Sequence, residues 1–266
     1  MDPSKYDGEI PAELRRQQIL SFIKGREFVR VADLSTHFGV SDVTVRSDLD
    51  MLAELGQLRR VRGGAIPDVR PHLERPFEET LATYPREKEA IGRAAAQIVT
   101  SGQTIILDVG TTTTAVARAL IARDNLQDVV IFTPSLNIAF ALEPAIPRFT
   151  VILTGGTLRP MQHSLIDPLG GLLLERITAH IAFLGCNGID HRGGVTNINL
   201  PETEIKRRML RASRRIVVAD SSKVGQIEVA YLCGADEIDM LITDGGADAG
   251  ELAALHERNV EIQIAK

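Results

Sequence analysis

The loop Asp108-Val109-Gly110-Thr111-Thr112-Thr113-Thr114 has the composition of an anion-binding corner. It follows the apolar run 104–107 and opens a segment with helical periodicity, so a strand should end and a helix should begin here. The first turn of a helix presents unpaired backbone N–H groups and the positive end of the helix dipole, which suit a phosphate. The loop is neither a Walker loop, which needs a following lysine, nor a dinucleotide-binding glycine pattern. The alternative is a threonine-rich helix cap without a ligand.

Four further polar turns follow apolar runs. They are Thr133-Pro134-Ser135, Gly155-Gly156-Thr157-Leu158-Arg159, Gly185-Cys186-Asn187-Gly188-Ile189-Asp190 and Asp220-Ser221-Ser222-Lys223. In a parallel sheet all such turns lie along one edge, where ligands bind. We therefore predict a site for a small polyhydroxylated anion, formed by Asp108, Gly110, Thr111, Thr112, Thr113, Ser135, Gly155, Gly156, Asn187, Lys206 and Lys223. The two lysines are candidate phosphate or carbonyl partners; alternatively, each is an ordinary surface lysine.

A second set of residues near the N-terminus suits contact with duplex DNA. On a helix expected from Asp42 to Glu54, the side chains of Thr44, Arg46 and Ser47 project outward from the first turns, where a recognition helix reaches base edges. Ser41 precedes this helix, and its hydroxyl can meet a phosphate. A hairpin after the helix carries three more cations that can neutralise phosphates or enter a minor groove, namely Arg59, Arg60 and Arg62. The alternative is a small helical docking or dimerisation domain with a solvated charged hairpin.

The elements that must position this second set read as a winged helix-turn-helix over residues 1–67. Three short helical segments carry apolar residues at helical spacing: Ile19, Leu20 and Ile23; Val31, Leu34 and Phe38; Val45, Leu49 and Leu52. Gly25, Gly39 and Gly56 are expected to end them, and Ser41 is expected to cap the third. The segment 58–66, with arginines around Gly63-Gly64, predicts a two-stranded wing with a tight turn.

The anion site is expected on an α/β domain over residues 86–266, joined to the first domain by a proline-rich linker over 68–85. Near-continuous apolar runs predict a parallel sheet buried on both faces. The expected strands are 104–107, 129–132, 150–153, 181–184, 215–219, 240–243 and 260–264. The expected covering helices are 88–99, 113–122, 136–142 and 202–212.

Composition excludes several classes of protein. The chain has 266 residues, 44% of them hydrophobic and 24% charged, which is ordinary globular usage. We expect no membrane span, because no apolar run approaches the roughly 20 residues required, and no secretory signal, because residues 1–9 contain no apolar segment. Two cysteines, Cys186 and Cys233, fit a cytoplasmic protein, and six scattered histidines lack metal-ligand spacing. We predict no metal and no cofactor.

The charge distribution leaves both functions possible. The net charge is −5, yet residues 13–65 carry nine Lys/Arg against seven Asp/Glu and form the only net-basic block. This pattern is compatible with a DNA-binding head on an acidic body, and equally with ordinary local variation.

Several motifs resemble the DeoR family of bacterial transcription regulators. In the head these are Arg15-Arg16-Gln17-Gln18-Ile19-Leu20, the segment 38–49 and Leu58-Arg59-Arg60-Val61-Arg62-Gly63-Gly64-Ala65; in the body they are the segments 108–113, 155–159 and 219–223. The resemblance implies a winged helix-turn-helix and a sugar-phosphate-sensing domain related in fold to ribose-phosphate isomerases. It also implies a repressor of carbohydrate metabolism genes that a phosphorylated sugar releases from double-stranded operator DNA.

Some positions depart from the family pattern, and they bear on specificity. Ser47 and Arg62 replace a usual arginine and histidine on the expected DNA face, while Pro134, Asp167 and Asn187 replace a usual Asn, Gly and Asp in the body.

A DNA-binding monomer with so few cations would bind weakly, so we expect a homo-oligomer with two heads about 34 Å apart.

The competing hypothesis is a sugar-phosphate isomerase-like enzyme with an N-terminal docking domain. Such an enzyme needs a carboxylate base and an electrophile beside the substrate carbonyl, and Asp190, Glu204 and Lys206 are the candidates. Asn187 occupies an expected carboxylate position, and a catalyst has no evident need for the head.

Overall fold

The computed structural model describes residues 11–23, 26, 28–54, 58–67 and 74–266. It divides into two compact units, Met1–His72 and Leu73–Lys266, each of which is described here by itself. No helix in these described ranges is long and apolar enough to cross a bilayer.

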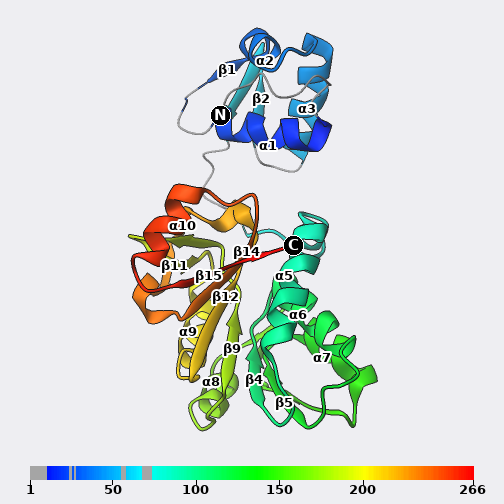
Figure 1. Ribbon diagram of the computed structural model, residues 1–266, viewed down its shortest axis with the longest axis vertical. Coiled ribbons are helices and arrows are strands. Elements are labelled where there is room, and N and C mark those ends of the chain that lie inside the picture. Colours follow the sequence, from blue (N-terminus) through cyan, green and yellow to red (C-terminus); the bar gives the residue numbers. More distant parts are fainter. Residues whose placement is uncertain (1–10, 24–25, 27, 55–57, 68–73) are drawn as a thin grey trace. The chain divides into compact units, whose positions relative to one another are not determined.

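The first unit is a winged helix-turn-helix (Figure 1). Its helices are α1 (Ala12–Ile23), α2 (Val31–Phe38) and α3 (Asp42–Glu54). Its antiparallel sheet has the order β1-β3-β2, with β1 at Val29–Arg30, β2 at Leu58–Val61 and β3 at Gly64–Pro67. The predicted helices and hairpin are confirmed, whereas β1, a two-residue strand, was not predicted. Gly39 ends α2 in the left-handed region, with φ 66°; Gly25 and Gly56 lie outside the described residues.

The core of this unit confirms the predicted inward face of α3. Val45, Leu49 and Leu52 are buried against α1 and the sheet. Asp48 is buried with them, at 2% exposure, and its carboxylate pairs with Arg15 Nε at 2.6 Å and Arg16 Nε at 3.0 Å. This carboxylate therefore ties α3 to α1, a contact that sequence reasoning missed.

The second unit is built on a seven-stranded parallel sheet with the order β15-β14-β12-β9-β4-β5-β6. Its strands are β4 (Thr104–Leu107), β5 (Val129–Thr133), β6 (Phe149–Leu153), β9 (Ile181–Leu184), β12 (Arg214–Val218), β14 (Met240–Asp244) and β15 (Glu261–Ala265). These strands coincide, within a residue or so, with the seven predicted runs. Smaller elements were not predicted: the hairpin of β7 (Thr157–Arg159) and β8 (Ser164–Ile166), and the sheet of β10 (Gly188–Asp190), β11 (Gly194–Asn197) and β13 (Ala230–Cys233).

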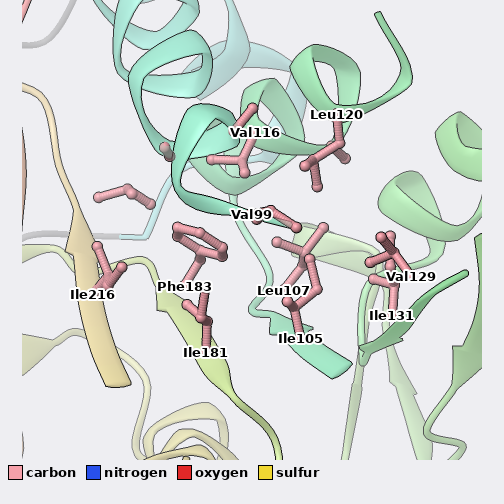
Figure 2. Close-up of a cluster of buried hydrophobic side chains, with 14 of the residues drawn as sticks. Val99, Ile105, Leu107, Val116, Leu120, Val129, Ile131, Ile181, Phe183 and Ile216 are labelled. Atoms are coloured by element: carbon pink, nitrogen blue, oxygen red, sulfur yellow. The ribbon is translucent and has the colours of Figure 1, made fainter. Parts of the chain in front are cut away.

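Helices cover both faces of the large sheet (Figure 1). They are α4 (Phe77–Leu81), α5 (Pro85–Ile98), α6 (Thr111–Ile121), α7 (Leu136–Leu142), α8 (Leu169–Leu174), α9 (Leu200–Met209) and α10 (Ala249–His256). Alternate strand residues enter opposite cores: Ile105 and Leu107 pack with α5 and α6, as Figure 2 shows, while Ile106 packs on the side of α9. Burial on both faces explains why the strands read as continuous apolar runs.

The predicted linker is shorter than the sequence suggested. Residues 68–73 lie outside the described residues, but residues 74–84 contain α4 and belong to the second unit. Phe77 is buried at 5% exposure and anchors α4. Pro76 is the N-cap of α4 and Pro85 begins α5, so neither proline belongs to an extended tether.

Candidate functional site

The sheet order places the point where the strand order reverses between β4 and β9. From β4 the chain adds β5 and then β6 on one side, and later adds β9, β12, β14 and β15 on the other. The connections on the two sides diverge, and in sheets of this kind ligands bind outside the carboxyl ends of the two central strands, a place here called the crevice. Asp108 follows β4 and Gly185 follows β9, so the predicted loops meet at this crevice.

Asp108 is fully buried and holds the two central strand ends together. Its Oδ1 accepts a hydrogen bond from Val109 N at 2.8 Å, and its Oδ2 accepts one from Gly185 N at 2.9 Å. Lys206 Nζ, from α9, lies 2.8 Å from the same Oδ2. Asp108 thus organises the loops from within.

Lys206 is neither a surface lysine nor a cation with spare donors. It is 4% exposed, and its ammonium also donates to Gly185 O at 3.0 Å and Asn197 Oδ1 at 3.1 Å. Burial lowers the Lys206 pKa, but the Asp108 and Glu202 carboxylates outweigh burial and raise it. Its three N–H bonds thus face three acceptors, and none is left for the phosphate contact predicted for Lys206. We place Lys206 at the floor of the crevice, below the ligand.

The first turn of α6 keeps its backbone donors. Gly110 precedes α6 with φ 141°, and no side chain in the described residues caps this helix. The hydroxyls of Thr113 and Thr114 donate to Gly110 O at 3.0 and 2.7 Å. The N–H groups of Thr111, Thr112 and Thr113 are therefore the donors available to an anion.

Lys223 supplies a cation at the same edge of the sheet. It ends a short 3-10 turn, Ser221–Lys223, that follows β12, the strand next to β9. Within residues 74–266 its ammonium makes no ion pair or hydrogen bond, and it is half-buried. Burial has the larger effect on two nearby groups, since it raises the pKa of Cys186 and lowers the pKa of Lys88. The Lys223 charge lowers the pKa of both.

Lys88 is a buried cation that sequence reasoning missed. It lies on α5 at 3% exposure, and its Nζ donates to Thr80 O and Thr83 O, both at 2.6 Å. Burial lowers its pKa to about 8, an effect that Asp220 opposes and Lys223 reinforces. Its helical phase with the buried Ile91 and Ala95 was the signal that could have identified it.

The remaining predicted residues border the crevice and make structural contacts. Ser135 is fully buried and caps α7 by accepting from Ile138 N at 3.3 Å. Asn187 Oδ1 accepts from Ile198 N at 3.1 Å. Gly155 and Gly156 have φ values of 76° and 128°, and a Cβ at Gly156 would lie 2.1 Å from Ile166 O, so a tight turn explains both glycines.

Arg159, on β7, joins two carboxylates from different segments. Its guanidinium donates to both carboxylate oxygens of Glu74, one of them at 2.9 Å, and to Glu202 Oε2 at 2.5 Å. Burial raises the pKa of Glu202 to about 7, while Lys206 and Arg159 oppose that rise. The sequence analysis singled out neither Glu74 nor Glu202, because the residues around each of them give no sign of a partner so far away in the chain.

The predicted DNA face of α3 carries exposed polar side chains. Ser41 Oγ accepts from Thr44 N at 3.1 Å, which confirms the predicted cap. Ser47 is exposed, and the Arg46 side chain, 58% exposed, is 3.8 Å from Asp42. On the wing, Arg59 and Arg62 are exposed.

Arg60 has internal partners. Its Nε is 2.7 Å from Asp50 Oδ1, and its Nη1 donates to Gly64 O at 3.0 Å. This arginine therefore ties the wing to α3 as well as adding positive charge near the expected DNA face.

The groups proposed for an enzyme do not converge. Glu204 is exposed and pairs with Arg207, Lys206 is saturated, and Asp190 accepts from the N–H groups of the β10–β11 turn. Burial raises the Cys186 pKa to about 12, which keeps the thiol protonated.

One group of metal-ligand types occurs in the described residues: Asp190, His191 and Glu251. His191 Nδ1 lies 2.8 Å from Glu251 Oε2, and His191 Nε2 accepts from Arg192 Nε at 3.1 Å. Both ring nitrogens therefore have partners, and the Nδ1 contact ties α10 to the turn after β10.

Comparisons with known proteins match both units. The family model "DeoR C terminal sensor domain" matches residues 83–245, and "DeoR-like helix-turn-helix domain" matches residues 15–68. The chain is 34% identical over 249 residues to the HTH-type transcriptional regulator YulB of Bacillus subtilis (strain 168), covering 93% of this chain and 95% of that protein. It is 31% identical over 252 residues to the glycerol-3-phosphate regulon repressor of Escherichia coli (strain K12), covering 94% and 98%.

Among solved structures, ribose 5-phosphate isomerase A from Methanocaldococcus jannaschii overlaps 51% of this chain and 52% of its own, with a TM-score of 0.37 and 19% identity. The family models and relatives span the head and the body alike and favour the regulator over the enzyme. The chain belongs to the DeoR family of DNA-binding transcriptional regulators.

Proposed function

We propose that this protein is a cytoplasmic repressor of carbohydrate metabolism genes, which a phosphorylated sugar releases from its operator. The sugar-phosphate part is supported by two groups at the carboxyl edge of the sheet: the α6 N-terminus, which no side chain caps in the described residues, and Lys223, which has no ion pair within residues 74–266. Backbone N–H groups and a lysine ammonium are a common cradle for a phosphate. The name of the glycerol-3-phosphate regulon repressor supports the same chemical class.

We assign the phosphate to Lys223 and the N–H groups of Thr111, Thr112 and Thr113. The buried Asp108–Lys206 pair fixes the positions of these groups rather than touching the ligand, because its polar atoms are already bonded. The sugar hydroxyls extend toward the neighbouring strand-end turns. The polar atoms of these turns come from Ser135, Gly155, Gly156 and Asn187.

The DNA contacts are assigned to the exposed first turns of α3 and to the wing. Ser41, Thr44, Arg46 and Ser47 approach the major groove, while Arg59, Arg60 and Arg62 neutralise phosphates or reach the minor groove. Two heads of a homo-oligomer would reach successive major-groove faces about 34 Å apart. The sugar phosphate releases the operator only if it binds more tightly to the conformation with low DNA affinity.

Two substitutions separate the surfaces in the full-length protein. Arg46→Ala should weaken binding to the DNA upstream of its own gene at least tenfold, through a lost base or phosphate contact, and leave the sugar-phosphate response unchanged. Lys223→Ala should keep DNA binding and lose most of the thermal stabilisation that a panel of phosphorylated sugars gives the wild type. Gel shift and thermal shift measure the two responses.

Arg211→Ala is the control for Lys223→Ala, since it alters an exposed cation before the amino end of β12, at the opposite edge of the sheet. Full sugar-phosphate stabilisation of Lys223→Ala would show that the phosphate lies elsewhere. Wild-type DNA affinity of Arg46→Ala would remove α3 from the interface.

A further inference from the structure

The segment 74–84, here called the strap, joins the body to the residues that lead to the DNA-binding head. The strap is the first described part of the body and contains α4. Any ligand signal that passes along the chain from the crevice to the head crosses it. The following inference rests on the proposed function, because it concerns how an anion in that crevice acts on the strap.

Several ties hold the strap on the body, and most come from the β7–β8 hairpin. Glu74 pairs with Arg159, Arg75 O accepts from Gln162 Nε2 at 2.6 Å, and Glu78 Oε1 lies 2.8 Å from His163 Nε2. Lys88 adds the last tie through Thr80 O and Thr83 O. These polar contacts add to the packing of the buried Phe77, and a change in local charge can alter them.

The Glu74–Arg159 tie shares a side chain with the line of charges that leads to Asp108. Arg159 also binds Glu202 in the first turn of α9, one turn before Lys206, which holds Asp108 at the crevice floor. Arg159 and Glu202 are 14% and 9% exposed as side chains, so water screens this pair weakly. Along this line three carboxylates (Glu74, Glu202 and Asp108) face two cations (Arg159 and Lys206).

We propose that an anion in the crevice competes with Glu74 for the Arg159 guanidinium and so loosens the strap. A phosphate adds up to two negative charges to a line already rich in carboxylates. Arg159 is the cation on this line that can turn from one carboxylate partner to a new anion, since Lys206 is enclosed by three acceptors. By linkage, the anion weakens the Glu74–Arg159 pair by the same factor as the pair weakens anion binding.

Glu74→Gln tests the proposed competition at the Glu74–Arg159 pair, here called the clasp, in the whole chain. Inorganic phosphate is the probe. The variant keeps the shape of the side chain but loses its charge, so phosphate should bind about fivefold more tightly than to the wild type by titration calorimetry. Hydrogen–deuterium exchange at Thr80, Ala82 and Thr83 should be faster without phosphate in this variant. In the wild type, phosphate itself should speed exchange at these amides. Affinity for the DNA upstream of its own gene should fall toward the phosphate-bound value.

Glu78→Gln is the matched control. It removes the same charge from the strap, but at the tie to His163, which does not share Arg159. It should leave phosphate affinity within about twofold of the wild type, because this exposed pair is screened by water. Glu74→Asp, which retains the charge, should restore most of the wild-type behaviour.

The outcomes separate this inference from the proposed function. If the wild type binds phosphate but Glu74→Gln binds it no better and the strap amides exchange equally with and without phosphate, the clasp is wrong and the crevice site stands. If Glu74→Gln and Glu78→Gln gain the same phosphate affinity, the gain comes from the lost negative charge alone, and the clasp is wrong. If the wild type binds neither inorganic phosphate nor any sugar phosphate, both the crevice site and the clasp are wrong.

Discussion

At the scale of single residues, the site depends on buried charges, and each of them needs an opposite charge beside it. Removing one member of the Asp108–Lys206 pair would leave the other buried without its counter-ion, which typically costs about 3–5 kcal/mol. Substituting Asp108 therefore cannot distinguish a lost ligand contact from collapsed loops at β4 and β9. Lys223, which supports no other side chain in residues 74–266, is the residue at which ligand binding can be tested separately from stability.

Glu202 predicts a specific dependence of stability on pH. Its folded-state pKa of about 7 exceeds its ordinary value of 4.5, so the folded protein holds this proton more tightly than the unfolded chain does. Stability should therefore fall as pH rises from about 5 to 8, by about 2 kcal/mol from this group. The facing groups Lys206, Asp108, Arg159 and Glu74 stay in place in Glu202→Gln.

Glu202→Gln should lose that part of the pH dependence. Urea unfolding of both proteins at pH 5 and pH 8 measures it, and the difference in free energy of unfolding should grow with pH in favour of the variant. Parallel curves would mean that Glu202 is ionised throughout, with its pKa held down by Arg159.

At the scale of elements, α3 performs two tasks with opposite faces. Its outer face presents Arg46 and Ser47, while its inner face buries Val45, Leu49 and the carboxylate of Asp48. Because Asp48 binds arginines on α1, the angle between α1 and α3 depends on an ion pair as well as on apolar packing. The position of the DNA face thus depends on a residue that does not belong to it.

Asp48→Ala should destabilise the head by about 3 kcal/mol, because it leaves Arg15 buried without this carboxylate. Differential scanning calorimetry should show the head unfolding at a lower temperature and the body transition unmoved. Asp50→Ala, which removes an exposed carboxylate of the same helix, serves as the control and should cost under about 1 kcal/mol. A head transition unchanged in Asp48→Ala would show that packing alone holds α1 on α3.

At the scale of the whole molecule, our proposal has an acidic chain bind DNA through a small set of arginines. The net charge of −5 makes non-specific attraction weak, so DNA affinity should depend on salt through the few cations of the head. Arg62→Ala should reduce the slope of log affinity against log salt by about 1 in gel-shift titrations. Phosphate binding by the body should not change. An unaltered slope would place Arg62 away from the DNA backbone.

The sequence by itself determined the seven strands of the large sheet, the helices of the head and the wing, but not β1, α4 or the smaller sheets. Continuous apolar runs specify strands buried on both faces, Ser41 and Gly39 specify a helix start and a helix stop, and the pattern around Gly63-Gly64 specifies the wing. These signals are local, since each depends on spacing within one element or on the backbone preference of one residue. The site loops could be predicted for the same reason, because each directly follows a strand.

Only the tertiary structure decided which of those loops meet and which of their charges remain available. The order of strands puts the ends of β4 and β9 side by side, encloses Lys206 within three acceptors and leaves Lys223 unpaired in residues 74–266. It also brings Glu74, Arg159 and Glu202 together from positions far apart in the chain. The ionisation and the partner of a buried charge depend on every element packed against it, and no local pattern in the sequence encodes that environment.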